Sequence, residues 1–191
     1  MSLNPRDITI STGRLLLRPF ESHDFEAYAA YHALPDVYRY LYAPAPAGEA
    51  LRAQFDDLLD APFENDGDTL RLAVTRGEDG VLLGEVLLKH AQRSALQGEV
   101  GYIFDPRHAG RGYATEAVTA MVSLGFDTIG LHRIFARLDA ANAGSIGVVE
   151  RLGMRREAHL IQNDRYDGVW GDEFVYAVLA REWAARRQTT R

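Results

Sequence analysis

Two glycines one residue apart follow a short apolar stretch near the middle of the chain. They are Gly110 and Gly112, in the segment RHAGRGYATEA at residues 107–117. A glycine has no Cβ atom, so a ligand can approach its backbone closely and a positive φ is tolerated. A tight strand-to-helix connection without any ligand uses glycine for the same reason, so the turn by itself leaves both interpretations open.

A helical pattern begins directly after this turn, at about Gly112 or Tyr113. The unpaired N–H groups of a first helical turn, together with the positive end of the helix dipole, form a site for an anion. Arg107, His108 and Arg111 add positive charge, so the turn suits a pyrophosphate group. It is not a Walker loop, because no Gly-Lys-Ser/Thr follows, and it is not the dinucleotide fingerprint, because the third glycine is missing.

The elements that must position this turn follow from the spacing of the apolar residues. This spacing predicts strands at 14–18, 69–75, 81–90, 99–104, 133–139, about 154–162 and 173–180. It predicts helices at 25–34 (ended by Pro35), around Leu51–Leu59, from about 113, and at 142–152 with Gly153 as the C-cap. Residues 42–48 are expected to form a loop, residues 163–172 a turn region, and residues 180–191 a frayed tail.

The order of these elements indicates the fold class. Runs of antiparallel strands interrupted by a few crossovers predict an α+β sheet of mixed direction. One long helix joins the strand at 99–104 to the strand at 133–139. These two strands are therefore expected to be parallel, with a right-handed connection.

The composition limits the kinds of protein that the chain can be. Its 191 residues fit one domain, and 47% of them are apolar, enough for one continuous core. The net charge of −6 argues against a nucleic-acid surface and suits a cationic substrate, although solubility alone also accounts for it. The absence of cysteine excludes a disulfide framework, a thiolate zinc site and a cysteine nucleophile.

The expected partners and location follow from patterns that the sequence lacks. We see no run long enough for a membrane helix and no signal-peptide pattern, so we expect a cytoplasmic protein without a membrane partner. The six histidines show no metal-ligand spacing, so no metal site is expected.

Several segments resemble one family of enzymes. Arg107-x-x-Gly110-x-Gly112 matches the Q/R-x-x-G-x-G/A signature of GNAT acyltransferases, and the order of the elements matches as well. Four segments look like the RimJ/RimL branch, the ribosomal-protein N-terminal acetyltransferases: TGRLLLRPFESHDFEAY, GYATEAV, NAGSIGVVERLGM and DEFVYAVLAREW. The resemblance implies a single domain over residues 1–191 with the GNAT fold: one mixed, mostly antiparallel sheet of seven strands, two splayed parallel central strands, and flanking helices.

The resemblance also implies acetyl-CoA as the co-substrate. In the family, acetyl-CoA lies where the two central strands splay apart, with its pyrophosphate on the turn and its pantetheine along the preceding strand. The cofactor-binding residues that this implies are Tyr102, Ile103, Phe104, Arg107, His108, Ala109, Gly110, Arg111, Gly112, Tyr113, Ala114, Asn142 and Ser145. Asn142 is also expected as a helix N-cap, and a cap can do both jobs. Ala109 departs from the bulky aromatic that relatives often carry there.

Acetyl transfer to an amine requires a base, because only a neutral amine attacks a thioester and a protonated α-amine has a pKa of about 8. The resemblance makes Glu99, which opens the central strand, the candidate base, with an ordinary strand-end carboxylate as the alternative. Many relatives place a tyrosine that acts as the general acid seven residues after the asparagine that corresponds to Asn142. Here that residue is Val149, so Ser145 is the candidate group that stabilises the leaving thiolate. The absence of cysteine favours direct transfer in a ternary complex.

The amine acceptor is where several interpretations stay open. Residues 42–48 and 163–172 are expected to frame its pocket, with Asp172 and Glu173 nearby, and the candidate lining is Tyr38, Tyr40, Tyr42, Tyr166 and Trp170. Ordinary packing or turn roles are the alternative for each. The resemblance favours the N-terminal α-amine of a protein or peptide. A small amine such as a polyamine or aminoglycoside, and an acyl-CoA sensor without catalysis, are the alternatives, and the chain is expected to be a monomer or homodimer.

Overall fold

The fold is that of a computed structural model, which describes residues 4–189. Residues 1–3 and 190–191, which belong to the predicted domain and tail, lie outside the described residues. The strands are β1 (Ile10–Ser11), β2 (Leu15–Arg18), β3 (Thr69–Arg76), β4 (Leu82–Gln92), β5 (Gln97–Phe104), β6 (Arg133–Asp139), β7 (Arg155–Tyr166) and β8 (Val169–Leu179). The helices are α1 (Phe25–His32), α2 (Pro35–Tyr38), α3 (Gly48–Leu59), α4 (Tyr113–Asp127), α5 (Ala143–Arg151) and α6 (Ala180–Thr189).

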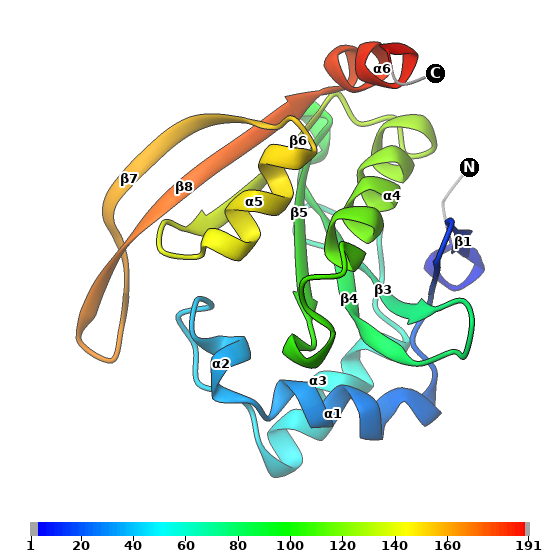
Figure 1. The fold of residues 1–191 in the computed structure, drawn as a ribbon, viewed down its shortest axis with the longest axis vertical. Coiled ribbons are helices and arrows are strands. Elements are labelled where there is room, and N and C mark those ends of the chain that lie inside the picture. Colours follow the sequence, from blue (N-terminus) through cyan, green and yellow to red (C-terminus); the bar gives the residue numbers. More distant parts are fainter. Residues whose placement is uncertain (1–3, 190–191) are drawn as a thin grey trace.

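One mixed sheet of eight strands, in the order β1-β2-β3-β4-β5-β6-β8-β7, runs through the described residues (Figure 1). Only β5 and β6 pair in parallel, and all other neighbours are antiparallel. The predicted α+β class and the two central parallel strands are confirmed. The prediction of seven strands missed β1, because two residues are too few to show an alternating pattern.

Alternation along the strands separates two helical layers. On β3, Leu70, Leu72 and Val74 belong to the large core cluster that includes residues of α4 and α5. Ala73, which points to the other face, belongs to the cluster formed with α1 and α3. Helices α4 and α5 therefore cover one face of the sheet, and α1 and α3 cover part of the other.

The parallel strands separate after a short common stretch. Their register pairs are Gln97 with Arg133, Gly98 with Ile134, and Glu99 with Phe135. Beyond this point β5 continues to Phe104 and pairs only with β4. The edge of β5 that faces β6 is therefore free of strand partners from residue 100 onward. Figure 1 shows the start of α5 beside this opening.

The C-terminal segment is a helix and not the predicted frayed tail. Residues 180–189 form α6, and Trp183 on it is 5% exposed. The Trp183 indole N–H donates to the Ser123 hydroxyl at 3.1 Å, and Arg187 forms an ion pair with Asp127. The segment is polar on average, and this average hid the single aromatic residue that anchors it.

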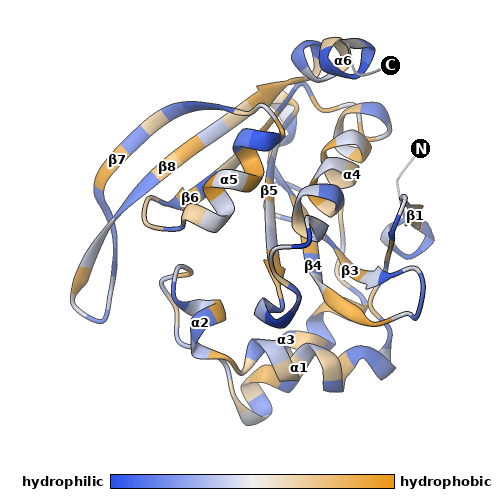
Figure 2. Cartoon of the chain, viewed as in Figure 1, coloured by the Kyte–Doolittle hydropathy of each residue, from blue (hydrophilic) through white to orange (hydrophobic). Residues whose placement is uncertain are grey.

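The last hairpin is longer than predicted, and the turn region at 163–172 is wrong in extent. Strands β7 and β8 continue to Asp167 and Gly168, whose φ values of 47° and 80° suit a two-residue hairpin turn. The hairpin projects from the rest of the molecule (Figure 1), with apolar and polar stretches alternating along it (Figure 2). At the other end of the chain, α1 ends before Pro35 as expected, but Pro35 then begins α2.

Candidate active site

A cleft of about 950 Å³ opens where β5 and β6 separate. Its walls come from the outer half of β5, the glycine turn, the starts of α4 and α5, the end of β6, and α2. The two strands that were predicted to be parallel, β5 and β6, are therefore the strands whose separation creates the cleft. This arrangement provides one long wall of backbone and one wall of helix N-termini.

All predicted cofactor-binding residues except Arg107 line this cleft. They are Tyr102, Ile103, Phe104, His108, Ala109, Gly110, Arg111, Gly112, Tyr113, Ala114, Asn142 and Ser145. Several lining residues were missed by sequence reasoning, namely Arg71, Thr115, Arg137, Asp139, Gly144, Gly147 and Arg151. Their signal lies in the register of the sheet and in helix packing, which the sequence does not give directly.

The glycine turn has the backbone that its composition predicts. Gly110 and Gly112 have φ values of 75° and 77°, and a Cβ atom at Gly110 would meet nothing within 4 Å. The space beside Gly110 is therefore open to a ligand. Helix α4 begins at Tyr113 with Gly112 as its N-cap, and no side chain of residues 4–189 caps it. Its first N–H groups are therefore available to a ligand in the cleft.

Arg107 is held by a neighbouring carboxylate and does not line the cleft. Its guanidinium pairs with Asp105, which is 2% exposed and also accepts from the Arg107 backbone N–H at 2.9 Å. Burial opposes ionisation of Asp105, but these bonds outweigh it and hold its pKa below the ordinary value. In this geometry Arg107 organises the approach to the turn, and its charge is already paired.

A second arginine fixes the turn from the other side. The Arg14 guanidinium donates to the carbonyl of Arg111 at 2.9 Å and to Glu116 at 2.7 Å, and it lies over the Tyr113 ring. Glu116 also accepts from the Thr12 hydroxyl. Burial would raise the pKa of Glu116, yet these hydrogen bonds hold it below the ordinary value. The first-turn carboxylate of α4 is thus directed away from the anion site.

The start of α5 forms the opposite wall. The Asn142 side chain caps this helix by accepting from the Ser145 N–H at 3.0 Å, which confirms the predicted N-cap. The Tyr102 hydroxyl donates across the opening to the Ser145 carbonyl at 3.0 Å. Burial raises the pKa of Tyr102 to about 12, so this hydroxyl keeps its proton at neutral pH. Ser145 is placed at the cleft by two bonds through its own backbone.

Glu99 lies at the point of separation but does not line the cleft. It is opposite Phe135 in the last parallel pair and opposite Lys89 on β4. Its side chain is half-buried, on the same face of β5 as Gly101 and Ile103. This is the face on which α1 and α3 lie.

The part of the cleft beside α2, where the acceptor is expected to bind and which we call the acceptor half, carries both signs of charge. Asp36 and Asp139 line it together with Arg71 and Arg137. The Arg137 guanidinium makes a double hydrogen bond to Glu173, at 2.9 and 2.8 Å. Residues 42–47 form the predicted loop before α3. Glu173 does not line the cleft itself but accepts hydrogen bonds from Arg137, which does.

The predicted aromatic lining is only partly present. Tyr40 lines the cleft, whereas Tyr38 is buried against His32. Tyr42 bonds to Asp139 at the edge of the cleft. Tyr166 and Trp170 are 40% and 55% exposed on the projecting hairpin and do not line it. Their aromatic type suggested a pocket, but the length of the hairpin carries them away.

Comparison with known proteins decides the family. A family model described as an acetyltransferase (GNAT) domain matches residues 14–155. The chain belongs to the GNAT acetyltransferases. Among relatives, it is 32% identical over 176 residues to the uncharacterized N-acetyltransferase YnaD of Bacillus subtilis, covering 91% of this chain and 98% of the relative. This GNAT chain is therefore an acetyl-CoA-dependent N-acetyltransferase.

Two further relatives give the fold and one named acceptor. A GNAT-family acetyltransferase structure from Bacillus anthracis aligns with a TM-score of 0.81 and 30% identity, covering 92% of this chain and all of the other. The spermidine N(1)-acetyltransferase of Escherichia coli is 24% identical over 173 residues, covering 91% of this chain and 90% of the relative. The acceptor named for that protein is a polyamine.

The cleft of this GNAT enzyme fits acetyl-CoA on its own geometry. The free edge of β5 can pair with an extended amide-bearing chain, and the open turn at α4 offers N–H groups to phosphates. Within residues 4–189, no three acidic or histidine side chains are arranged to hold a metal ion. None of the helices described there is both long and apolar enough to span a bilayer.

Proposed function

We propose that the enzyme acetylates the N-terminal α-amine of a protein or peptide, by direct transfer in a ternary complex. Acetyl-CoA, when bound, supplies the acetyl group as a thioester. The free backbone of residues 102–104 is proposed to align the pantetheine and to polarise the thioester carbonyl. The turn from His108 to Ala114 is proposed to bind the pyrophosphate, with Asn142 and Ser145 on the other wall.

The proton and the leaving thiolate need separate groups. We propose Glu99 as the base, acting through water, because it lies beside the cleft at the strand separation with no ion pair or hydrogen bond among the described residues. Ser145 is proposed to donate a hydrogen bond to the departing thiolate. With no cysteine in the chain, the acetyl group passes directly to the amine.

The charge of the acceptor half is the observation that carries the choice of acceptor. Its lining presents the donors of two arginines, Arg71 and Arg137, beside the carboxylates of Asp36 and Asp139. Each arginine is also paired with a buried carboxylate, Glu85 or Glu173. A polyamine with several positive charges is best held by a wall of carboxylates alone. A peptide N-terminus has one amine followed by carbonyl oxygens, and it matches a wall with both donors and acceptors.

A small amine is the second candidate, and a specific observation favours it. The spermidine acetyltransferase of Escherichia coli is a relative over most of the chain. Asp36 and Asp139 line the acceptor half and can attract a cation. The two candidates share the acetyl-CoA site and differ only in what the acceptor half recognises.

Acetyl-CoA-dependent thiol release tests the proposal directly. The protein has no cysteine, so a thiol reagent detects only product CoA. The panel is short peptides that begin with Ser, Ala, Thr or Met, together with spermidine, lysine and an aminoglycoside. Release on a peptide class supports the proposal, and release on a small amine alone overturns it in favour of the second candidate. Acetyl-CoA binding with no release on the panel would contradict the proposed acceptor and favour the sensor.

Glu99→Gln and Ser145→Ala test the proposed roles within the same assay. Each is expected to lower kcat by about tenfold to a thousandfold while acetyl-CoA still binds. Glu99→Asp, which keeps a carboxylate, should retain more of kcat than Glu99→Gln if the residue acts as the base. Unchanged kcat in both variants would remove these residues from the chemistry.

A further inference from the structure

One arginine reaches the acceptor half of the cleft from a strand that the acetyl-CoA site does not use. Arg71 on β3 is directly opposite Leu87 on β4, which is opposite Gly101 on β5. Directly opposed residues share a face of the sheet, so Arg71 points to the face on which α1 and α3 lie. Its side chain is 26% exposed, and it lines the cleft with Leu87 and Gly101.

The guanidinium is anchored toward the cleft by a carboxylate that is completely buried. Its Nη1 donates to Glu85 at 2.5 Å, and Glu85 is 0% exposed. Glu85 is on β4, opposite Ile103 of β5. The bond therefore draws the Arg71 head from β3 over β4, to about one strand spacing, roughly 5 Å, from the strand that borders the reacting group.

Glu85 is itself held by side chains of α1. The Tyr31 hydroxyl donates to it at 3.3 Å, and His32 Nε2 lies 3.5 Å from the same oxygen. Burial would raise the pKa of Glu85, but Arg71 and His32 hold it below the ordinary value. Apolar residues usually stabilise such an interior as well as a buried ion pair does, so its presence here calls for a role beyond stability.

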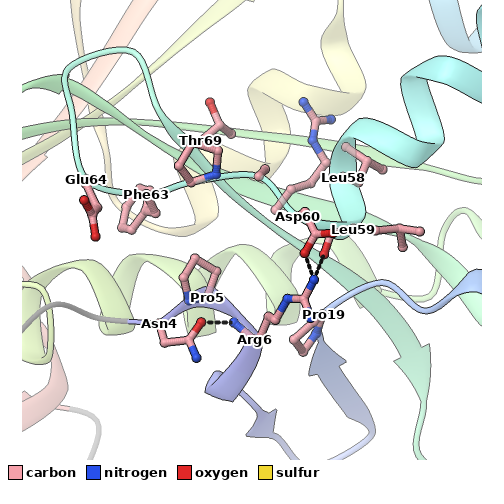
Figure 3. Close-up of a pocket in the computed structure, with 13 residues that line it drawn as sticks. Asn4, Pro5, Arg6, Pro19, Leu58, Leu59, Asp60, Phe63, Glu64 and Thr69 are labelled. Carbon is pink, nitrogen blue, oxygen red and sulfur yellow. Dashed lines mark hydrogen bonds and ion pairs between the residues drawn. The ribbon is translucent and has the colours of Figure 1, made fainter.

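Two sets of donors on this guanidinium remain for a ligand. Among residues 4–189, the Arg71 side chain makes its hydrogen bond through Nη1, and Nε and Nη2 make none. Arg71 also borders a smaller outer cavity of about 310 Å³, where Arg6 is paired with Asp60 (Figure 3). Arg71 thus borders both cavities, and its bond to Glu85 ties the guanidinium to the neighbouring strand β4, whose residue Leu87 also lines the cleft. A planar guanidinium with free donors recognises carbonyl and carboxylate oxygens.

We infer that Arg71 determines acceptor specificity by donating hydrogen bonds to a carbonyl or carboxylate oxygen next to the acetylated amine. The inference rests on the proposed function and narrows it. Acceptors are molecules in which a primary amine and such an oxygen are neighbours. A peptide N-terminus and a free amino acid both present this chemistry, whereas polyamines do not. Glu85, with Tyr31 and His32 behind it, is a positioning residue for Arg71.

The test compares three acceptors: an amidated tripeptide, the free amino acid of its first residue, and an alkyl monoamine of about the length of the tripeptide but without oxygen. The tripeptide begins with whichever of Ser, Ala, Thr or Met gives the fastest thiol release. The parent is expected to show a kcat/KM about 10- to 100-fold higher for an oxygen-bearing acceptor than for the monoamine. The ratio between tripeptide and amino acid separates the two sources of the oxygen.

The variants separate recognition from folding. Arg71→Met combined with Glu85→Met removes both charges together, so that no buried carboxylate is left unpaired. In this variant the advantage over the monoamine is expected to fall to about twofold or less, while the KM for acetyl-CoA stays within about twofold. Arg71→Lys keeps the charge but loses the planar donors, and an intermediate ratio is expected. Arg52→Met, on the exposed pair with Asp56 of α3, is the matched control with an unchanged ratio.

Each outcome bears on one proposal. A parent that prefers the monoamine, or a folded double variant that keeps the full preference, overturns the role of Arg71 and leaves N-acetyltransferase activity intact. No thiol release on any acceptor contradicts the proposed acceptor instead. Calorimetric titration of the tripeptide amide into the CoA complex then decides the inference, since binding must weaken by about tenfold or more in the double variant for it to stand.

Discussion

The Tyr42 hydroxyl donates a hydrogen bond to the carboxylate of Asp139, 97 residues further along the chain. Tyr42 follows α2 with a left-handed φ of 51°, and Asp139 is the last residue of β6. The bond therefore joins the loop after α2 to the strand on the far wall, at the acceptor end of the cleft. Burial and the bond to Asp139 raise the pKa of Tyr42, so its hydroxyl keeps the proton that makes the bond.

Tyr42→Phe is expected to raise the KM for the acceptor by about 3- to 10-fold, because the loop loses its hydrogen bond to the wall. The KM for acetyl-CoA should stay within about twofold, since the turn and the β5 edge are untouched. Steady-state kinetics with each substrate varied in turn measures the split.

A second variant tests the same contact from the other side. A Cβ atom at Gly171 would clash with the hydroxyl and ring of Tyr42. Gly171→Ala should therefore displace Tyr42 and raise the acceptor KM as Tyr42→Phe does. Tyr166→Phe, on the exposed part of the same hairpin, is the control with parental kinetics. A rise in the acetyl-CoA KM instead would mean that the loop supports the cofactor wall.

Gly110→Glu is expected to weaken acetyl-CoA binding by a hundredfold or more. It places a side chain and a negative charge in the open space of the turn, where the pyrophosphate is proposed to bind. Calorimetry or the KM for acetyl-CoA measures the loss.

Gly130→Glu provides the matched control for this substitution. Gly130 also has a left-handed φ, 79°, and open space where a Cβ would be, so it carries the same backbone strain outside the cleft. Its acetyl-CoA affinity should be parental. Equal affinity of the parent and a folded Gly110→Glu variant would show that the site is placed wrongly.

Arg14→Ala is expected to raise the KM for acetyl-CoA by about 3- to 10-fold while acceptor KM stays parental. The variant removes the hydrogen bond from Arg14 to the Arg111 carbonyl, and it leaves Glu116 without its arginine partner. In a double-mutant cycle with Glu116→Gln, the two effects should be less than additive, because both act on one contact. Additive effects would show that the two residues act on the turn independently.

Local chemistry was predictable from the sequence, and long-range geometry was not. The turn at Gly110 and Gly112, the Asn142 cap and β6 at residues 133–139 each depend on neighbouring residues, and the structure has them as expected. Arg14 contributes through contacts with Arg111 and Glu116, which are 97 and 102 residues away in the sequence. Arg71 contributes through a contact with Glu85 on the neighbouring strand. Nothing in their own segments distinguishes them from surface arginines.

The two errors in the C-terminal part have a related cause. The polar average of residues 180–191 hid Trp183. The segment 163–172, which contains two glycines and four Asp or Asn residues, suggested one broad turn. In the structure, a two-residue turn at Asp167 and Gly168 suffices, because both residues tolerate a positive φ. Average polarity predicts exposure, but a single buried aromatic or a single turn decides the element.

Trp183→Ala is expected to lower the free energy of unfolding by about 3–5 kcal/mol, the usual cost of removing a large buried aromatic. The side chain is 5% exposed and packs near Phe126 of α4. Chemical denaturation measures the loss. Arg187→Ala on the same helix removes only an exposed ion pair and should cost about 1 kcal/mol or less. Parental stability of Trp183→Ala would mean that α6 is not part of the cooperative unit.

Acid should destabilise the protein in part through Glu85, whose pKa in the folded state lies below its ordinary value. A carboxyl with a depressed pKa contributes stability that is fully present above its unfolded pKa of about 4.3 and is lost as the pH falls through the folded pKa. Glu85→Gln removes this contribution and leaves Arg71 unpaired, so at pH 7 the free energy of unfolding should fall by about 3–5 kcal/mol. The difference between parent and variant should shrink as the pH falls below about 4.3, as measured by urea titrations at several pH values. A difference that stays constant down to pH 3 would show that the Glu85 carboxylate is not what stabilises this part of the core.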